Sequence, residues 1–282
     1  MDELFGQFAG YQPRKKIASG GIADIYEATD LKTGQKVVLK ILKEEWSGNE
    51  EIRWKFQLEA SLQTTIINPH IVQVYDILNT AGHLIMVQEF VEGISLWHQF
   101  KKAKWISEEQ RQQIALQLAD GVSAIHHEDI IHCDLKPLNL ILESNSGLLK
   151  ICDFGNAVSL DQIQDGSWKR SDLIWGSPLY MAPEQCRGEI VSKATDVYAI
   201  GIILYRLYAG QLPLYSEDAD AVINMQCSVE PYSPNRLNPE IPGWLNELIQ
   251  KAVQKQPHDR YPDADALYQA LSLGYNMGQG NL

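Results

Sequence analysis

The residues from His132 to Asn139, with the sequence His-Cys-Asp-Leu-Lys-Pro-Leu-Asn, constrain this chain more than any other segment. Asn139 follows Asp134 by five residues, and Asp153 follows Asn139 by fourteen, within an Asp-Phe-Gly triplet. In such a set one carboxylate accepts the proton of a hydroxyl group, while an amide oxygen and a second carboxylate are hard oxygen ligands for Mg²⁺. The spacing therefore indicates phosphate-transfer chemistry, and the chain must fold so that these side chains meet at one phosphate group.

Other segments precede and follow this loop in a fixed order. Before it come a glycine-containing turn, an apolar run that indicates a strand, a helical stripe and a second apolar strand, at Ile17–Tyr26, Lys36–Leu42, Ile52–Gln63 and His83–Gly93. After it come a Gly-Ser-Pro to Ala-Pro-Glu segment, a helix apolar nearly all round that must be buried, and an arginine, at Gly176–Glu184, Asp196–Leu207 and Arg260. In this order the segments resemble the catalytic domain of eukaryotic-type (Hanks-type) serine/threonine protein kinases, in their bacterial form.

The resemblance covers residues 11–272 and implies an α+β, bilobed, protein-kinase-like fold. A small antiparallel β-sheet lobe with one helix would precede a larger, mostly helical lobe. We expect an N-terminal extension at residues 1–10, the kinase domain at 11–272 and a C-terminal tail at 273–282. Within the domain the boundaries are about 11–88 for the N-lobe, 89–93 for the hinge and 94–272 for the C-lobe.

The resemblance also implies that ATP lies in the cleft between the lobes. Lys40 would pair with its α- and β-phosphates, and we expect Glu59 to be the partner of Lys40, with Glu50 and Glu51 as alternatives. Ser95 is either a ribose contact or the N-cap of the next helix. The other expected ATP contacts lie in the glycine turn, on the adjoining strands and in the backbone of the hinge: Ile17, Ala18, Gly20, Gly21, Ile25, Val38, Glu89 and Val91.

For the transfer itself the resemblance assigns a role to each polar residue of the loop. Asp134 would accept the hydroxyl proton and Lys136 would contact the γ-phosphate, while Asn139 and Asp153 would hold Mg²⁺. Lys136 favours serine and threonine over tyrosine as acceptors, because tyrosine kinases usually carry a different segment at this point. The expected reaction is transfer of the γ-phosphate of Mg-ATP to Ser/Thr hydroxyls of protein substrates, with autophosphorylation as a further reaction.

Four positions depart from the family pattern. Ala18 and Ala23 replace two glycines of the phosphate-binding turn, which suggests a stiffer loop. Gln88 stands at the gatekeeper position before the hinge, and leaving its amide buried without a partner would cost about 1–3 kcal/mol. Cys133 replaces the arginine that binds an activation-loop phosphate. We therefore hypothesise that phosphorylation of the loop, at Ser167 or Ser171, is not needed for activity.

Composition narrows the classes of partner and the compartment. The 282 residues carry a net charge of −12, which argues against nucleic-acid binding and weakly favours basic peptide substrates. No apolar run approaches the ~20 residues of a membrane span, and the first residues lack a signal-peptide pattern. The four cysteines show no paired spacing for zinc or disulfides, which fits a reducing cytoplasm. The sequence predicts no oligomeric state.

Two alternatives share part of this pattern. A pseudokinase scaffold that binds nucleotide or partners without efficient transfer would also tolerate the altered glycines and Cys133, but it would need none of the polar residues assigned above. A kinase-like phosphotransferase for small molecules would share the loop and the metal-binding aspartate. The Ala182-Pro183-Glu184 segment, Asp196 and Arg260 favour a protein substrate.

Overall fold

The computed structural model describes residues 10–80, 82–102, 106–167 and 177–279, and it divides the chain into two compact units. The first comprises residues 1–67 and 71–92, and the second comprises residues 68–70 and 93–282. The division after residue 92 lies inside the segment 89–93 that we predicted as the hinge. Each unit is described by itself.

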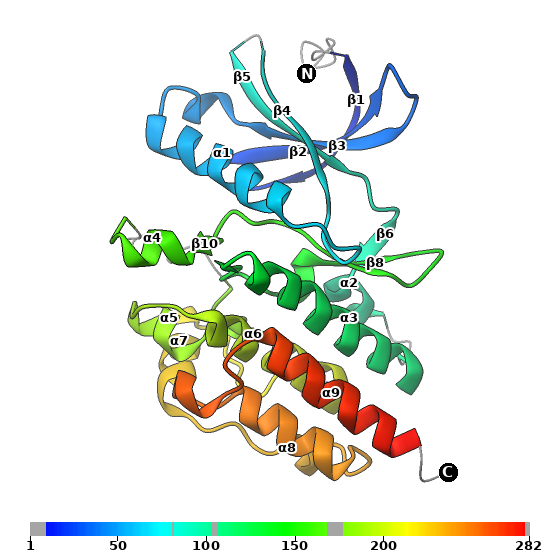
Figure 1. Ribbon diagram of the computed structural model, residues 1–282, viewed down its shortest axis with the longest axis vertical. Helices are drawn as coiled ribbons and strands as arrows, with labels where there is room; N and C mark the ends of the chain where they lie inside the picture. Colours follow the sequence, from blue (N-terminus) through cyan, green and yellow to red (C-terminus); the bar gives the residue numbers. More distant parts are fainter. Residues whose placement is uncertain (1–9, 81, 103–105, 168–176, 280–282) are drawn as a thin grey trace. The chain divides into compact units, whose positions relative to one another are not determined.

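The first unit is a five-stranded antiparallel sheet with one long helix (Figure 1). The strands, in the spatial order β1-β2-β3-β5-β4, are β1 (Tyr11–Ser19), β2 (Ala23–Asp30), β3 (Lys36–Leu42), β4 (Val74–Thr80) and β5 (His83–Glu89). A 3₁₀ turn, η2 (Glu44–Trp46), leads to helix α1 (Glu50–Thr65), which Asn49 caps by accepting the Ile52 N–H. This arrangement confirms the predicted sheet lobe with one helix.

Side chains that alternate along each strand give the sheet two buried faces. One face packs Tyr26, Leu39 and Val87 into an apolar cluster. The other packs Ala23, Leu42 and Met86 against Phe56 and Ala60 of α1. Residues placed on this second face therefore lie under α1.

The second unit is mostly helical (Figure 1). Its described residues also form a two-stranded sheet, β10-β7, and a three-stranded sheet, β6-β8-β9. The strands are β6 (Gly93–Ser95), β7 (Ile130–Ile131), β8 (Leu140–Glu143), β9 (Leu149–Ile151) and β10 (Val158–Ser159). The helices are α2 (Leu96–Lys101), α3 (Glu108–His127), α4 (Leu160–Gln164), α5 (Pro183–Arg187), α6 (Lys193–Ala209), α7 (Ala219–Ser228), α8 (Gly243–Ala252) and α9 (Ala264–Gln279). The described residues of this unit also form the 3₁₀ turns η3 (Pro137–Asn139), η5 (Pro178–Tyr180), η6 (Pro234–Arg236) and η7 (Pro257–Asp259).

Two of these helices organise the core. Helix α3 begins with a capping box between Ser107 and Gln110, and its apolar residues Ile114, Leu118, Val122 and Ile125 are buried. Helix α6 begins at Lys193, three residues earlier than predicted, and is buried on nearly all sides, as its apolar sequence requires. Both helices pack against β7, which directly precedes the loop His132–Asn139, called the catalytic loop below.

Helix α9 continues through residues 273–279 of the segment that we predicted as a C-terminal tail. Tyr275 is buried, its ring packs edge-on against Trp244 and its hydroxyl hydrogen-bonds to Tyr208. A Cβ added at Gly274 would lie 2.2 Å from the Trp244 ring. Gly274 therefore marks a close contact between helices, which the sequence pattern did not predict.

Candidate active site

Lys40 and Glu59 form a buried ion pair in the first unit. Lys40 Nζ lies 2.5 Å from Glu59 Oε1, and the Glu59 side chain is 1% exposed. The sheet register places Lys40 on the face that α1 covers, one strand away from Ile25 and Met86. The pairing resolves the choice between Glu59, Glu50 and Glu51 in favour of Glu59.

Other expected nucleotide contacts share this face. Ile25 pairs with Lys40 and Val38 pairs with Gln88 across neighbouring strands, and both apolar side chains are half-buried. Ile17 lies at a β-bulge between Lys16 and Ala18 and is exposed. The structure therefore brings Ile25, Val38, Lys40 and Glu59 together, with Ile17 at the end of the adjoining strand.

Gln88 finds the partner that burial requires. Its Nε2 donates to Gln63 Oε1 at 3.3 Å, and Gln63 Nε2 donates to the Val72 carbonyl at 2.6 Å. Gln63 lies one helical turn after Glu59 on α1, so the gatekeeper amide is tied to the helix that carries the ion pair. Sequence reasoning placed Gln63 on this stripe but did not identify it as the partner of Gln88.

The glycine turn between β1 and β2 is closed by a hydrogen bond from Gly20 N–H to the Ala23 carbonyl, at 2.8 Å. The carbonyl of Gly21 accepts from Trp46 Nε1 at 3.3 Å and from Lys43 Nζ at 3.4 Å. A Cβ added at Gly21 would meet nothing within 4 Å, so the backbone is open on that side. Ala23 is a buried β2 residue, which explains how alanine is accommodated at this position of the pattern.

The catalytic-loop residues form a compact polar cluster in the second unit. Lys136 Nζ lies 2.6 Å from Asp134 Oδ2, and Asn139 Nδ2 donates to the Asp134 carbonyl at 3.0 Å and to Asp134 Oδ2 at 3.3 Å. Burial raises the pKa of the Asp134 carboxyl, and the nearby Lys136 cation opposes that shift. The cluster thus holds a buried carboxylate beside one cation, with the asparagine fixed between loop backbone and carboxylate.

Asp153 is held next to this cluster by the residues around it. The Cys152 N–H donates to the Asn139 carbonyl at 3.0 Å, and the rings of His132 and Phe154 lie 4.8 Å apart between centroids. Asp153 itself has a φ of 66°, in the left-handed region. Such a backbone costs about 1–2 kcal/mol for a residue with a side chain, so the surrounding contacts must hold it.

The backbone of the catalytic loop is held in place by hydrogen bonds to Asp196 of α6. Its carboxylate accepts the N–H of His132 at 2.7 Å and the N–H of Cys133 at 2.9 Å. It also accepts from His126 Nε2 at 3.1 Å, which must carry the proton because His126 Nδ1 accepts the Ala264 N–H. Sequence reasoning used Asp196 only as a family marker, and its role as an anchor follows from these three bonds.

Cys133 adopts a φ of 62° and is buried among Ile131, Val158 and Val191. Its carbonyl accepts from Gln185 Nε2 at 2.8 Å, a contact that sequence reasoning missed. Burial raises the pKa of the Cys133 thiol well above its usual range, and the Asp196 and Asp134 carboxylates add to the shift. A thiol in this state is a packing residue and a poor nucleophile.

The family model for the protein kinase domain matches residues 11–271. The chain belongs to the protein kinase family. It is 29% identical to the serine/threonine-protein kinase PrkC of Bacillus subtilis, over 96% of this chain and 41% of that protein. It is 33% identical to the serine/threonine-protein kinase pkn3 of Myxococcus xanthus, over 94% of this chain and 50% of that protein. The kinase chain thus spans about half or less of the length of these relatives.

The residues of the kinase domain fit a Mg²⁺ ion at Asn139 and Asp153. Because Asn139 uses its amide nitrogen as a donor to Asp134, its Oδ1 is the atom left to act as a ligand. Asp153 supplies a carboxylate, and both are hard oxygen donors. Among the described residues, no group of three or more His, Cys, Asp or Glu side chains forms a metal cage. A magnesium ion here would take its remaining ligands from phosphate and water.

Helix α5 is tied into the second unit by an ion pair between Glu184 and Arg260, two residues of the family pattern. Arg260 Nη1 and Nη2 donate to Glu184 Oε1 and Oε2 at 2.7 and 2.8 Å, with both side chains buried. Ser171 lies outside the described residues.

The remaining predicted positions have simpler surroundings. Ser95 is the N-cap of α2 and accepts the His98 N–H at 3.4 Å, so the capping alternative describes its contacts. The Glu89 N–H donates to the Gln73 carbonyl at 2.8 Å, and Val91 is half-buried. The roles of Ser95, Glu89 and Val91 toward ATP stay predictions.

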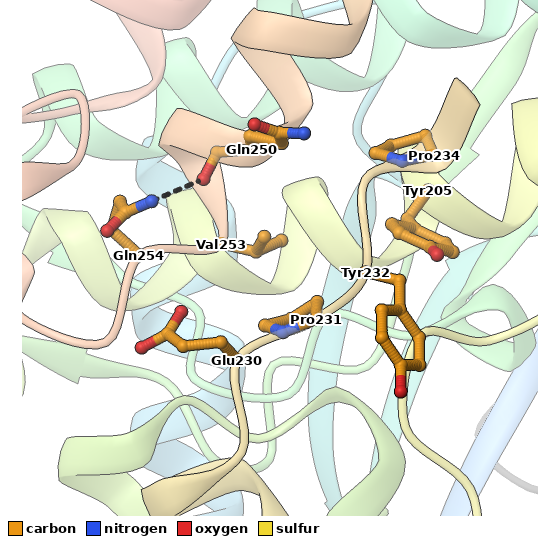
Figure 2. Close-up of a pocket in the computed structure, with 8 residues that line it drawn as sticks. All are labelled: Tyr205, Glu230, Pro231, Tyr232, Pro234, Gln250, Val253 and Gln254. Carbon is orange, nitrogen blue, oxygen red and sulfur yellow. Dashed lines mark hydrogen bonds between the residues drawn. The ribbon is translucent and has the colours of Figure 1, made fainter. Parts of the chain in front are cut away.

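A separate pocket of about 180 Å³ lies in the second unit (Figure 2). Its lining comes from α6, from the segment after α7 and from α8 and its end: Tyr205, Glu230, Pro231, Tyr232, Pro234, Gln250, Val253 and Gln254. None of the predicted site residues lines it. No described helix in the kinase domain has the length and apolar character needed to cross a membrane.

Proposed function

We propose that this domain transfers the γ-phosphate of Mg-ATP to serine and threonine hydroxyls of protein substrates. The observation that carries the proposal is the cluster of Asp134, Lys136 and Asn139, with Lys136 Nζ 2.6 Å from Asp134 Oδ2. A pseudokinase would need neither this cluster nor the buried pair of Lys40 and Glu59. The names of the relatives, all serine/threonine-protein kinases, support the same class of reaction.

Each charged residue has a role that its position allows. Asp134 accepts a hydrogen bond from the acceptor hydroxyl, orients its oxygen and takes up its proton as the new O–P bond forms. The bond from the γ-phosphorus to the β–γ bridging oxygen breaks in the same transfer, and ADP leaves. Lys136 supplies positive charge next to that carboxylate and stabilises the negative charge on the γ-phosphoryl oxygens. Lys40, positioned by Glu59, binds the α- and β-phosphates. Most of the rate enhancement then comes from positioning and electrostatic stabilisation.

Asn139 and Asp153 are the residues that would hold Mg²⁺. When bound, the ion neutralises phosphate charge and aligns the phosphoryl group. The chain's own contribution is to keep the two oxygen donors in place, through the Asn139 bonds to Asp134 and the Cys152 N–H bond to Asn139.

The test is transfer of labelled γ-phosphate from Mg-ATP to a generic basic protein, followed by identification of the phosphorylated amino acid. We expect phosphoserine or phosphothreonine, and we expect chelation of Mg²⁺ to stop the reaction. Phosphotyrosine would contradict the assignment of acceptor class. Binding of Mg-ATP without transfer to any protein would favour the scaffold instead.

A further inference from the structure

Arg206, on α6, is held in an unusual setting for a cation. Its guanidinium carbon lies 4.9 Å from the centre of the Trp97 ring and 4.6 Å from that of Phe100, both on α2. Its Nη1 donates to the Tyr180 hydroxyl at 2.9 Å. Aromatic faces and one hydroxyl fix the planar group in one orientation while leaving its charge intact.

Among the described residues, no carboxylate forms an ion pair with Arg206. Lys101 is a second cation near this ring, with its Nζ 4.8 Å from the centre of the Trp97 ring. Lys101 and the following residue, Lys102, are both exposed. In a chain with a net charge of −12, this is a local concentration of positive charge. An arginine has five N–H donors, so the half-buried Arg206 can still bind an anion.

The packing of the second unit places this group beside the catalytic loop. Helix α2, which carries Trp97 and Phe100, packs against η3, the turn that contains Asn139. Helix α6 packs against η5, the turn that ends at Tyr180. Arg206 therefore contacts both α2, which packs against the end of the loop, and Tyr180 of η5.

A chain of hydrogen bonds makes the second connection explicit. Two residues after Tyr180, the Ala182 N–H donates to Gln185 Oε1 at 3.0 Å, and Gln185 Nε2 donates to the carbonyl of Cys133 at 2.8 Å. Cys133 directly precedes Asp134. An extended peptide advances about 3.3 Å per residue, so residues a few positions from a hydroxyl held at Asp134 come within reach of this surface.

We propose that Arg206 is a specificity-determining residue that selects protein substrates with an anionic side chain a few positions from the phosphorylated serine or threonine. The anion is a carboxylate or a phosphate group, since a fixed guanidinium recognises both. The preference is opposite to that suggested by the net charge of the chain, because the charge next to the loop is positive. This inference rests on the proposed kinase function.

The experiment uses a neutral serine peptide in which each position within four residues of the serine is replaced in turn by Glu, Gln or Arg. The measured quantity is the ratio of kcat/KM between the Glu and Gln peptides at each position. At one or more positions we expect a ratio of about 3 to 10, the size of one partly exposed ion pair, and an Arg peptide that is poorer than the Gln peptide. Phosphoserine at the best position distinguishes a requirement for prior phosphorylation from recognition of acidic residues.

Arg206→Glu should abolish or invert the ratio, and Arg206→Lys should retain most of it. Arg236→Glu is the matched control. Arg236 of η6 also stacks on an aromatic ring, with its guanidinium carbon 4.4 Å from the centre of the Tyr232 ring, and the same change of charge there should leave the ratio unchanged. A purely structural role for Arg206 would lower kcat/KM for Glu, Gln and Arg peptides alike and leave their ratios as they are, which would overturn the inference.

A parent chain that phosphorylates all peptides without an anionic preference would overturn the inference while the kinase function stands. A parent chain that phosphorylates none would count against both.

Discussion

In the proposed mechanism Asp134 accepts the proton of the substrate hydroxyl, and its carboxylate is buried, where it is harder to ionise. Burial raises the pKa of Asp134, and the contact with Lys136 counteracts the rise. The pKa of the proposed proton acceptor thus depends on a neighbour two residues away, at a distance of 2.6 Å that only the structure shows.

This coupling predicts a pH effect. The carboxylate can act only when deprotonated, so kcat/KM should fall as the pH falls through the raised pKa of Asp134. Lys136→Ala removes the cation that lowers that pKa, so the acidic limb of the pH profile should move to higher pH. Lys136→Arg keeps the charge and should leave the limb where it is. The pH profile of kcat/KM for the three proteins decides the matter, and a limb in Lys136→Ala at the same or lower pH would contradict the account.

Cys133 leads to a second prediction at the residue scale. Cys133 is a neutral, buried thiol, and it cannot form an ion pair with a phosphate group on the activation loop as the arginine of the family pattern would. Changing both Ser167 and Ser171 to alanine should therefore leave peptide phosphorylation within about twofold of the parent. Steady-state rates on one peptide test this. A loss beyond about tenfold, or roughly 1.4 kcal/mol, would show that the loop phosphate has another partner.

At the scale of elements, α9 shows what close packing asks of the sequence. Gly274 lets α9 approach Trp244 of α8, and the ring of Tyr275, the next residue, packs edge-on against the Trp244 ring. The apolar residues of this segment fit a helix as well as a tail of mixed composition, and its contact with α8 is a tertiary feature. The sequence alone did not reveal it for this reason.

Gly274→Ala should therefore destabilise the second unit. Inserting the methyl group costs about 1–3 kcal/mol of unfolding free energy, and better helix propensity offsets up to about 1 kcal/mol of it. Gly243→Ala is the control, since a Cβ there would meet nothing within 4 Å and α8 should be unharmed. Thermal or urea unfolding of the two variants should show a lower midpoint for Gly274→Ala alone. Equal midpoints would mean that α9 is not packed as described.

At the scale of the whole molecule, the buried pair of Glu184 and Arg260 joins segments far apart in the sequence. Arg260 also donates to the carbonyls of Ala194 and Lys255, so it links α5, α6 and the end of α8. Glu184→Ala would leave the guanidinium buried without its carboxylate and should cost about 3–5 kcal/mol. Glu189→Ala breaks a partly exposed pair with Arg187, at 3.7 Å, and should cost at most about 1 kcal/mol. A similar drop in unfolding midpoint for both variants would refute this difference.

Much of the architecture could be predicted because the motifs are local. The strand with Lys40, the stripe with Glu59 and the capping box at Ser107 each have a pattern within one element. What could not be predicted are bonds between elements: Asp196 to the loop backbone, Gln185 to Cys133 and Gln63 to Gln88. Asp196 and Gln63 lie on predicted helices and Gln185 lies on α5, which was not predicted, and only the three-dimensional packing shows which distant group each side chain contacts.

The most direct test of the account compares phosphate transfer by the parent chain, Asp134→Asn and Asp220→Asn, with Mg-ATP binding measured for all three. Asp220 is an exposed carboxylate at the start of α7, so its variant makes the same change in charge away from the loop. We expect Asp134→Asn to bind Mg-ATP but lose transfer by at least about a hundredfold, as for removal of a general base, while Asp220→Asn matches the parent. Transfer by Asp134→Asn at the parent rate would show that Asp134 is not the residue that accepts the proton.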